Sequence, residues 1–222
     1  SSDSEHRDRK RMAAIKTVGV IGSGQMGNGI AHVAALAGFN VVLYDVSADR
    51  LKSAMATING NLTRQVAKKT ITEDAHKKAL TRISSADSLD GLAACDLVIE
   101  TAVEKEEIKR KIFHDLCAVL KPEAIIASNT SSISITRLAA TTDRPEKFIG
   151  IHFMNPVPVM ELAELIRGIA TDDATFDAAR EFVTAMGKQI AVSEDCPAFI
   201  VNFFFNETAT TEIYTLYEGV GN

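Results

Sequence analysis

The chain has 222 residues, of which 46% are hydrophobic and 24% are charged, as expected of a globular protein with a sizeable buried core. Acidic residues outnumber basic ones by 29 to 24, so the net charge of −5 provides no overall basic field for nucleic acid. No apolar run approaches the roughly 20 residues that a membrane-spanning helix needs, so we expect neither a nucleic-acid nor a membrane partner.

The first residues differ in composition from the rest of the chain. Residues 1–11 contain no aliphatic or aromatic side chain, so they can form neither a core nor the apolar middle of a signal peptide. We expect a flexible extension or a cloning remnant there, with Met12 as the native start.

Apolar strands and helices alternate along most of the remaining chain. Strands are expected at 17–22, 40–46, 94–102, 123–129 and 147–153, with helices at 25–39 and 47–69 and further helical stretches between the later strands. An apolar stretch at 159–166, a helix at 172–186 and a run at 188–193 follow. This order predicts an α/β fold over 12–193, a doubly wound and mostly parallel Rossmann-type sheet with helices on both faces.

A glycine-rich turn, Gly22-Ser23-Gly24-Gln25-Met26-Gly27, joins the first strand to the first helix. The spacing alone is weak evidence, but its place between strand and helix favours a dinucleotide site. Gly22 would allow the sharp turn, Gly24 the approach of a pyrophosphate, and Gly27 close packing of helix on strand. The N–H groups at the helix start, where Gln25 and Met26 lie, would then face the phosphates.

Asp45 ends the second strand, near the position expected for an acid that binds the adenosine ribose hydroxyls. A carboxylate there would repel the 2′-phosphate of NADP. The sequence therefore predicts NAD as the preferred cofactor.

One histidine, His152, is expected at the carboxyl end of a strand, where open α/β sheets bind their ligands. If the strands on either side of Asn155-Pro156-Val157-Pro158 pair as a hairpin centred on Pro158, His152 faces Glu164. A carboxylate in that position would fix the tautomer of the imidazole and favour its protonated form, which suits an acid/base group.

Plainer interpretations remain open for the same residues. His152 lies between apolar neighbours and could be a packed core residue, while Glu161 competes with Glu164 as its partner. Ser131 and Ser132 could cap the helix expected through 134–140, although they would also lie over the ligand edge.

Several segments in succession resemble the L-3-hydroxyacyl-CoA dehydrogenases, most closely the bacterial 3-hydroxybutyryl-CoA dehydrogenases. They are VGVIGSGQMGNGIA, DLVIETAVE, ASNTSSISIT, IHFMNPVPVMELAELI and CPAFIVN, which occur in the family's order over residues 16–202. The resemblance implies that the protein interconverts two acyl-CoA thioesters, (S)-3-hydroxyacyl-CoA and 3-ketoacyl-CoA, with NAD as the cofactor.

The resemblance also implies roles for individual residues. His152 and Glu164 would form the acid/base pair, and Ser131 and Asn202 would hydrogen-bond the reacting oxygen of the substrate. Glu104, Lys109 and Asn155 would contact the nicotinamide side or ribose of the cofactor, and Asn61 and Lys68 would lie near CoA. Lys68 has an ordinary alternative as part of a solvated helix end.

The end of the chain departs from the family pattern. Residues 203–212, FFFNETATTE, replace the arginine and the helix that the family has after FIVN. The resemblance implies that 194–222 begin an all-helical C-terminal domain, apparently truncated here, through which the full-length parent would form a homodimer. Two other functions stay open: a dehydrogenase of a free hydroxy acid or sugar acid, and a truncated, non-catalytic NAD-binding module.

The three cysteines bear on the compartment. Cys95, Cys117 and Cys196 are an odd number without C-x-x-C spacing, which argues against a disulfide framework or a structural zinc site. A reducing, cytoplasmic location is therefore expected, and no metal ligands are predicted.

Overall fold

The computed structural model describes residues 15–195. The predictions for residues 1–11, for Cys196, Asn202 and the departure at 203–212, and for a helical domain after 195 lie outside the described residues. No helix within 15–195 is long and apolar enough to cross a membrane.

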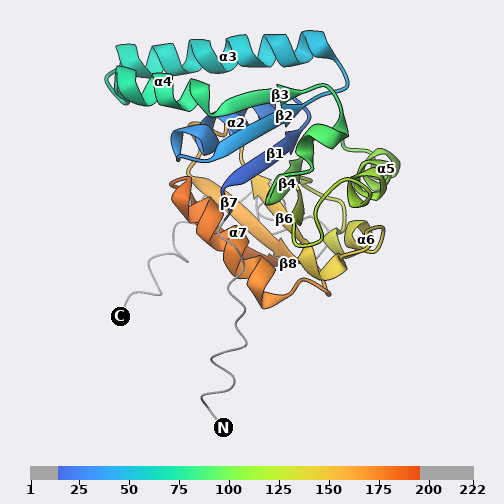
Figure 1. Ribbon diagram of the computed structural model, residues 1–222. Helices are drawn as coiled ribbons and strands as arrows, with labels where there is room; N and C mark the ends of the chain where they lie inside the picture. The colour runs from blue at the N-terminus through green and yellow to red at the C-terminus, as the bar shows by residue number, and fades with distance from the viewer. Residues whose placement is uncertain (1–14, 196–222) are drawn as a thin grey trace, which may run out of the picture.

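Within residues 15–195, eight strands form a single sheet in the order β3-β2-β1-β4-β5-β6-β7-β8 (Figure 1). Neighbouring strands run parallel except β6 and β7, which are antiparallel. The strands are β1 Thr17–Ile21, β2 Asn40–Tyr44, β3 Ile83–Ala86, β4 Leu97–Glu100, β5 Ile125–Ser128, β6 Phe148–Phe153, β7 Leu162–Arg167 and β8 Gln189–Glu194. The predicted doubly wound, mostly parallel α/β sheet is thus confirmed.

The edge strand β3 is not among the predicted strands. Its sequence, ISSA, has exposed serines at both central positions and no apolar run that would indicate a strand. Among the described strands it pairs with β2 alone, and this pairing depends on the fold of the rest of the sheet.

Helices α2, α3 and α7 begin and end within three residues of the predicted ranges. The helices are α2 Gln25–Leu36, α3 Ala48–Ala67, α4 Glu73–Thr81, α5 Glu106–Cys117, α6 Ile135–Ala139 and α7 Asp173–Ala185, with short 3₁₀ turns η1 Leu89–Leu92 and η2 Pro145–Lys147. The Ser47 hydroxyl accepts the Arg50 N–H at the start of α3, as an N-cap does. The cap of α6 is Ser134, whose hydroxyl accepts the Arg137 N–H, so the capping alternative for Ser131 and Ser132 is wrong.

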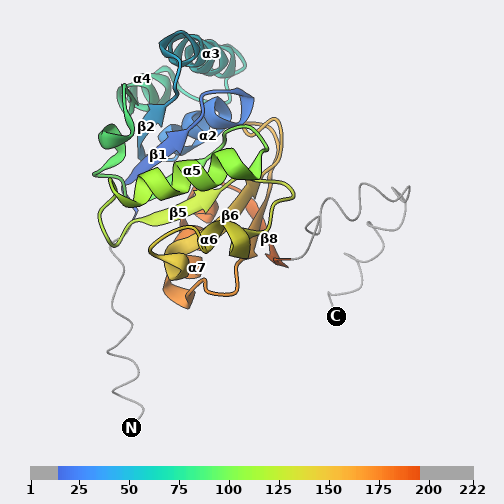
Figure 2. The ribbon, with the colours of Figure 1, turned by 90° about the vertical axis from the view of Figure 1, so that its right-hand side faces the viewer.

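Strand side chains alternate between two hydrophobic cores, one on each face of the sheet. Ile125 and Ala127 of β5 pack in the core that includes Ile30 of α2 and Val183 of α7, whereas Ile126 packs in the other core. Helices α5 and α6 cover that second face (Figure 2). The helix pair α3 and α4 lies beyond the β3 edge and packs against α2 (Figure 1).

The carboxyl ends of β1, β2, β4, β5 and β6 meet at one edge of the sheet. Strand order reverses between β1 and β4, the place where ligands bind in open α/β sheets. The glycine-rich turn, Asp45, Glu104, Ser131 and Asn155 all follow directly from strands that end there.

Candidate dinucleotide and acid–base site

The glycine-rich turn has the geometry that a dinucleotide requires. Gly22 has φ of +93°, which is in the left-handed region that side chains rarely adopt. A Cβ on Gly27 would lie 1.7 Å from the Gly22 carbonyl oxygen, so only glycine allows α2 to pack this close to β1. A Cβ on Gly24 would meet no atom within 4 Å, which leaves the backbone there open to a ligand.

The start of α2 offers N–H donors to an anion. Gly24 is the N-cap residue and provides no side-chain cap, and the first N–H that bonds inside the helix is that of Asn28, to the Gly24 carbonyl. The N–H groups of Gln25 and Met26 precede that bond, so the helix dipole and its unpaired donors point toward the ligand edge.

Asp45 lies directly beneath the turn and is almost completely buried. Its Oδ2 accepts the N–H and the hydroxyl of Ser23 at 2.8 and 2.9 Å, and its Oδ1 accepts the Ser47 N–H at 3.0 Å. Burial alone would raise the pKa of this carboxyl, but the bonds from Ser23 and Ser47 outweigh it and hold the pKa below its usual value. Oδ1 keeps acceptor capacity for one more donor, such as a ribose hydroxyl.

His152 and Glu164 face each other across the β6–β7 hairpin in the predicted register. His152 Nδ1 lies 2.7 Å from Glu164 Oε2, Glu164 is fully buried, and His152 is 9% exposed. Glu161 is exposed and instead accepts from the Gln189 side chain at 3.3 Å. The structure therefore brings His152 together with Glu164 and not with Glu161.

The loop between β5 and α6 carries Ser131, whose N–H donates to Glu104 Oε1 at 3.2 Å. Lys109 Nζ lies 3.2 Å from the other oxygen of Glu104 and 2.8 Å from Glu100. The Lys109 side chain is 1% exposed and that of Glu104 is 40% exposed, so Glu104 is the more accessible of the two at the ligand edge.

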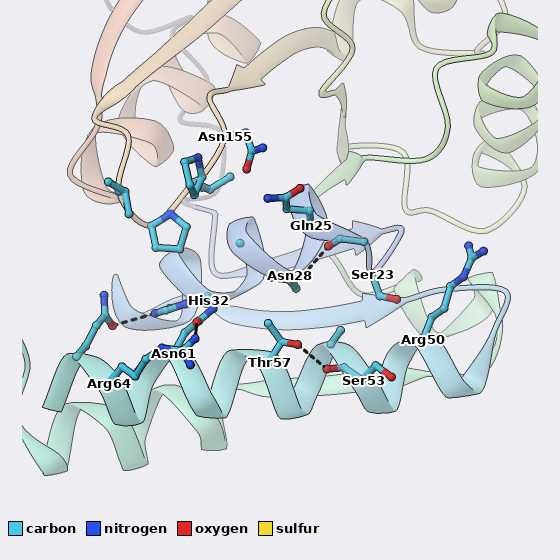
Figure 3. A pocket seen from close by; sticks show the side chains of 18 of the residues that line it. Ser23, Gln25, Asn28, His32, Arg50, Ser53, Thr57, Asn61, Arg64 and Asn155 are labelled. Atoms are coloured by element: carbon cyan, nitrogen blue, oxygen red, sulfur yellow. Dashed lines mark hydrogen bonds between the residues drawn. The ribbon is translucent and has the colours of Figure 1, made fainter. Parts of the chain in front are cut away.

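A cavity of about 680 Å³ opens beside the glycine-rich turn. It lies between α2, α3 and the connection from β6 to β7, and Figure 3 shows Asn61 and Arg64 on α3 facing it, with Asn155 on the opposite side. Its lining includes Gly24, Gln25, Arg50, Asn61, Lys68 and Asn155. The cavity thus unites the two predicted CoA-side residues with part of the predicted cofactor site, while His152, Glu164 and Ser131 are not among its lining residues.

Three supporting residues were not predicted as part of the site. Glu100 is fully buried under the ligand edge, Asn129 accepts the Phe153 N–H at 2.9 Å next to His152, and Lys188 donates to the Val157 and Met160 carbonyls at 2.6 and 2.7 Å. A charged residue ending the apolar strand LVIE was the signal for Glu100. Lys188 gave no sequence signal, because its partners are backbone carbonyls distant along the chain.

Within residues 15–195, no cluster of His, Cys, Asp and Glu side chains could hold a metal ion. The contact between His152 and Glu164, the glycine-rich turn and the Asp45 carboxylate below the turn are instead the features of a dinucleotide-binding oxidoreductase domain.

Comparison with known proteins gives the family. Residues 17–196 match the family model described as 3-hydroxyacyl-CoA dehydrogenase, NAD binding domain, so the chain belongs to this family. A 3-hydroxybutyryl-CoA dehydrogenase of Bradyrhizobium diazoefficiens is 78% identical over 210 residues, 95% of this chain and 72% of the relative. One of Mycobacterium tuberculosis is 41% identical over 191 residues, 85% of this chain and 67% of the relative.

Solved structures agree with this assignment. The crystal structure of (S)-3-hydroxybutyryl-CoA dehydrogenase from Ralstonia eutropha is 43% identical with a TM-score of 0.86, and the match covers 94% of this chain and 74% of that chain. The predicted family, the Rossmann-type fold and NAD as the cofactor are confirmed, and the chain is an NAD-dependent oxidoreductase of the 3-hydroxyacyl-CoA dehydrogenase type.

Proposed function

We propose that the protein interconverts (S)-3-hydroxybutyryl-CoA and acetoacetyl-CoA, with His152 and Glu164 as its acid/base pair. The observation that carries the proposal is the 2.7 Å contact between His152 Nδ1 and Glu164 Oε2 at the ligand edge of an NAD-binding sheet. The substrate follows from the name of the relative that is 78% identical.

The chain's own residues would move the proton and hold the substrate. NAD bound at the glycine-rich turn would supply the acceptor for the hydride that leaves C3 of the hydroxyacyl group. His152 Nε2 accepts the proton of the 3-hydroxyl, while Glu164 keeps Nδ1 protonated and stabilises the imidazolium that forms. In the reverse direction the same imidazolium donates its proton to the 3-keto oxygen.

Ser131 and Asn202 are proposed to hydrogen-bond the reacting oxygen, so that it is oriented and its charge is stabilised before the hydride moves. Ser131 follows β5 at the same edge as His152. Asn202 lies outside the described residues and rests on the family resemblance alone.

The cofactor and CoA would share the space around the glycine-rich turn. Gly22, Gly24, Gln25, Met26 and Gly27 would hold the pyrophosphate and Asp45 the adenosine ribose, as the open backbone and the remaining acceptor capacity of Asp45 allow. Glu104, Lys109 and Asn155 remain proposed contacts on the nicotinamide side.

We assign the CoA moiety to the cavity against α3. Asn61 and Lys68 line it together with Arg50 and Arg64. The positive charges of Lys68 and the two arginines would suit the phosphates of CoA. CoA would supply binding energy remote from the reacting carbon.

The test follows NADH oxidation with acetoacetyl-CoA and, separately, with acetoacetate. Turnover that depends on the CoA thioester supports the proposal. Turnover of the free acid would instead favour a hydroxy-acid or sugar-acid dehydrogenase, and NADH binding without either reaction would indicate a non-catalytic NAD-binding module.

We further propose that residues 12–193 form the NAD-binding domain, that 194–222 begin a helical domain, and that the full-length parent is a cytoplasmic homodimer. The continuous sheet from Thr17 to Glu194 supports the first of these bounds. Light scattering on the full-length parent and on this chain would measure whether the dimer depends on residues beyond 222.

A further inference from the structure

A charged side chain lies fully buried beneath the ligand edge. Glu100, the last residue of β4, is 0% exposed. Its Oε1 accepts the Ala102 N–H at 2.6 Å and faces Lys109 Nζ at 2.8 Å, and its Oε2 accepts the Ser128 hydroxyl at 2.8 Å. Burial raises the pKa of Glu100 although these three donors oppose that shift. A buried ion pair is costly to desolvate, so its presence is weak evidence of a contribution to stability.

Lys109 connects this buried carboxylate to one at the surface. Its ammonium group has three donors, and three acceptors surround it: Glu100, the Ala102 carbonyl at 3.3 Å and Glu104 at 3.2 Å. Lys109 is therefore held from below by Glu100 and itself holds Glu104 in place.

Glu104 in turn gathers the loop between β5 and α6. Its Oε1 accepts the Thr130 hydroxyl and lies 3.3 Å from the Ser132 hydroxyl. The Ser131 N–H donates to the same oxygen at 3.2 Å. Three consecutive residues of the loop thus depend on the orientation of one carboxylate.

The neighbouring residue ties this loop to the strand that carries His152. The Asn129 side chain accepts the N–H of Phe153, the residue after His152, at 2.9 Å. A shift of the loop would therefore alter the placement of Ser131 relative to His152.

We propose that Glu100 is a positioning residue for the reaction, acting through a relay of Glu100, Lys109 and Glu104 that fixes residues 130–132 and with them Ser131. The inference rests on the proposed function, since it takes Ser131 to hold the reacting oxygen. The competing interpretation is that Glu100 and Lys109 form a structural ion pair with no effect on the reaction beyond keeping the protein folded.

Removing both charges together separates the two interpretations. Lys109→Met alone leaves Glu100 buried without its cation, and we expect a marked loss of thermal stability. The double variant Glu100→Gln/Lys109→Met buries no unpaired charge, so stability should return toward that of the wild type. Its Glu104 carboxylate still lacks the ammonium that orients it.

The readout is kcat with acetoacetyl-CoA at saturating NADH in the full chain. We expect the double variant to fold stably and to lose about 10- to 100-fold in kcat, because a misplaced loop costs rate without unfolding the protein. The Ser131→Ala variant should show a comparable loss. Adding Ser131→Ala to the double variant should cost little more, since the relay acts through that residue.

A matched control is the exposed ion pair of Lys111 and Asp115, which are 2.6 Å apart and lie on α5, the helix that carries Lys109. Lys111→Met/Asp115→Asn likewise removes one positive and one negative charge, but at the surface, and kcat should stay unchanged.

Recovery of kcat together with stability would overturn the inference, and so would losses that multiply when Ser131→Ala is added. A wild-type chain that does not turn over acetoacetyl-CoA would instead contradict the proposed function. The two failures are therefore distinguishable.

Discussion

Glu164→Gln tests the proposed acid–base pair most directly. The substitution preserves the size of the side chain and removes the charge that faces His152 at 2.7 Å. Unit charges roughly 4 Å apart interact by about 4 kcal/mol at an effective dielectric constant of about 20. The amide can still make a neutral hydrogen bond worth about 1 kcal/mol, which leaves a loss of about 3 kcal/mol when the imidazolium forms. Since about 1.4 kcal/mol is tenfold in rate, kcat should fall by about 100-fold.

The assay is NAD reduction with (S)-3-hydroxybutyryl-CoA, the direction in which the imidazolium forms, paired with a fluorescence titration of NADH binding. NADH affinity should remain close to that of the wild type, because Glu164 lies on β7, away from the glycine-rich turn. Glu161→Gln is the matched control, since Glu161 is exposed and contacts Gln189 instead of His152. Unchanged turnover in Glu164→Gln, or an equal loss in Glu161→Gln, would refute the paired mechanism.

Three further predictions concern the turn, the cofactor preference and the response to acid. Gly27→Ala should lower the free energy of unfolding by about 1–3 kcal/mol and weaken NADH binding, because its Cβ would meet the backbone of the turn at 1.7 Å. Gly60→Ala, in the middle of α3 where a Cβ meets nothing within 4 Å, should raise the free energy of unfolding by about 0.5–1 kcal/mol. Urea denaturation measures the free energy of unfolding of the two variants, and equal effects would contradict the packing argument. Asp45→Ala should weaken NAD binding by about tenfold, or about 1.4 kcal/mol, and NADP binding less; an unchanged preference in titrations of both would refute the ribose assignment. Asp96→Asn should cost about 1–2 kcal/mol of unfolding free energy at pH 7, because Asp96 accepts the Lys16 and Thr17 N–H groups at 2.8 and 2.9 Å. Burial alone would raise the pKa of Asp96, but these bonds and Lys121 hold that pKa below its usual value. The stability advantage of the wild type over Asp96→Asn should therefore be complete above about pH 4 and be lost as the pH falls through the lower, folded-state pKa. Unfolding of the wild type and of Asp96→Asn is followed at pH 7 and at a pH below the folded-state pKa of Asp96, with Asp115→Asn on the exposed surface as the control. A stability difference between wild type and Asp96→Asn that persists in acid would contradict the prediction.

Local patterns were sufficient for much of the site. The spacing between two apolar runs on either side of Pro158 predicted that His152 faces Glu164, because hairpin pairing relates residues whose numbers share one sum. The glycine-rich turn was equally readable from its spacing, since Gly22 has a positive φ and a Cβ on Gly27 would lie 1.7 Å from the Gly22 carbonyl oxygen five residues earlier.

Other features depend on contacts that no local pattern encodes. Strand β3 has a polar sequence and becomes a strand only because β2 offers it an edge. Ser134, not its neighbours Ser131 and Ser132, caps α6, and the Asp195 carboxylate also accepts the Ser134 hydroxyl at 2.7 Å from 61 residues along the chain.

The periodicity of the chain and its glycine, proline and histidine positions suffice to derive a doubly wound sheet, an NAD site and the contact between His152 and Glu164, because those features depend on residues near one another in sequence. Only the folded molecule reveals that Lys109 is buried between Glu100 and Glu104 and that Glu104 holds the loop of Ser131. Burial and charge pairing across β4, α5 and the β5–α6 loop arise when the sheet assembles, and they decide which polar residues support the site.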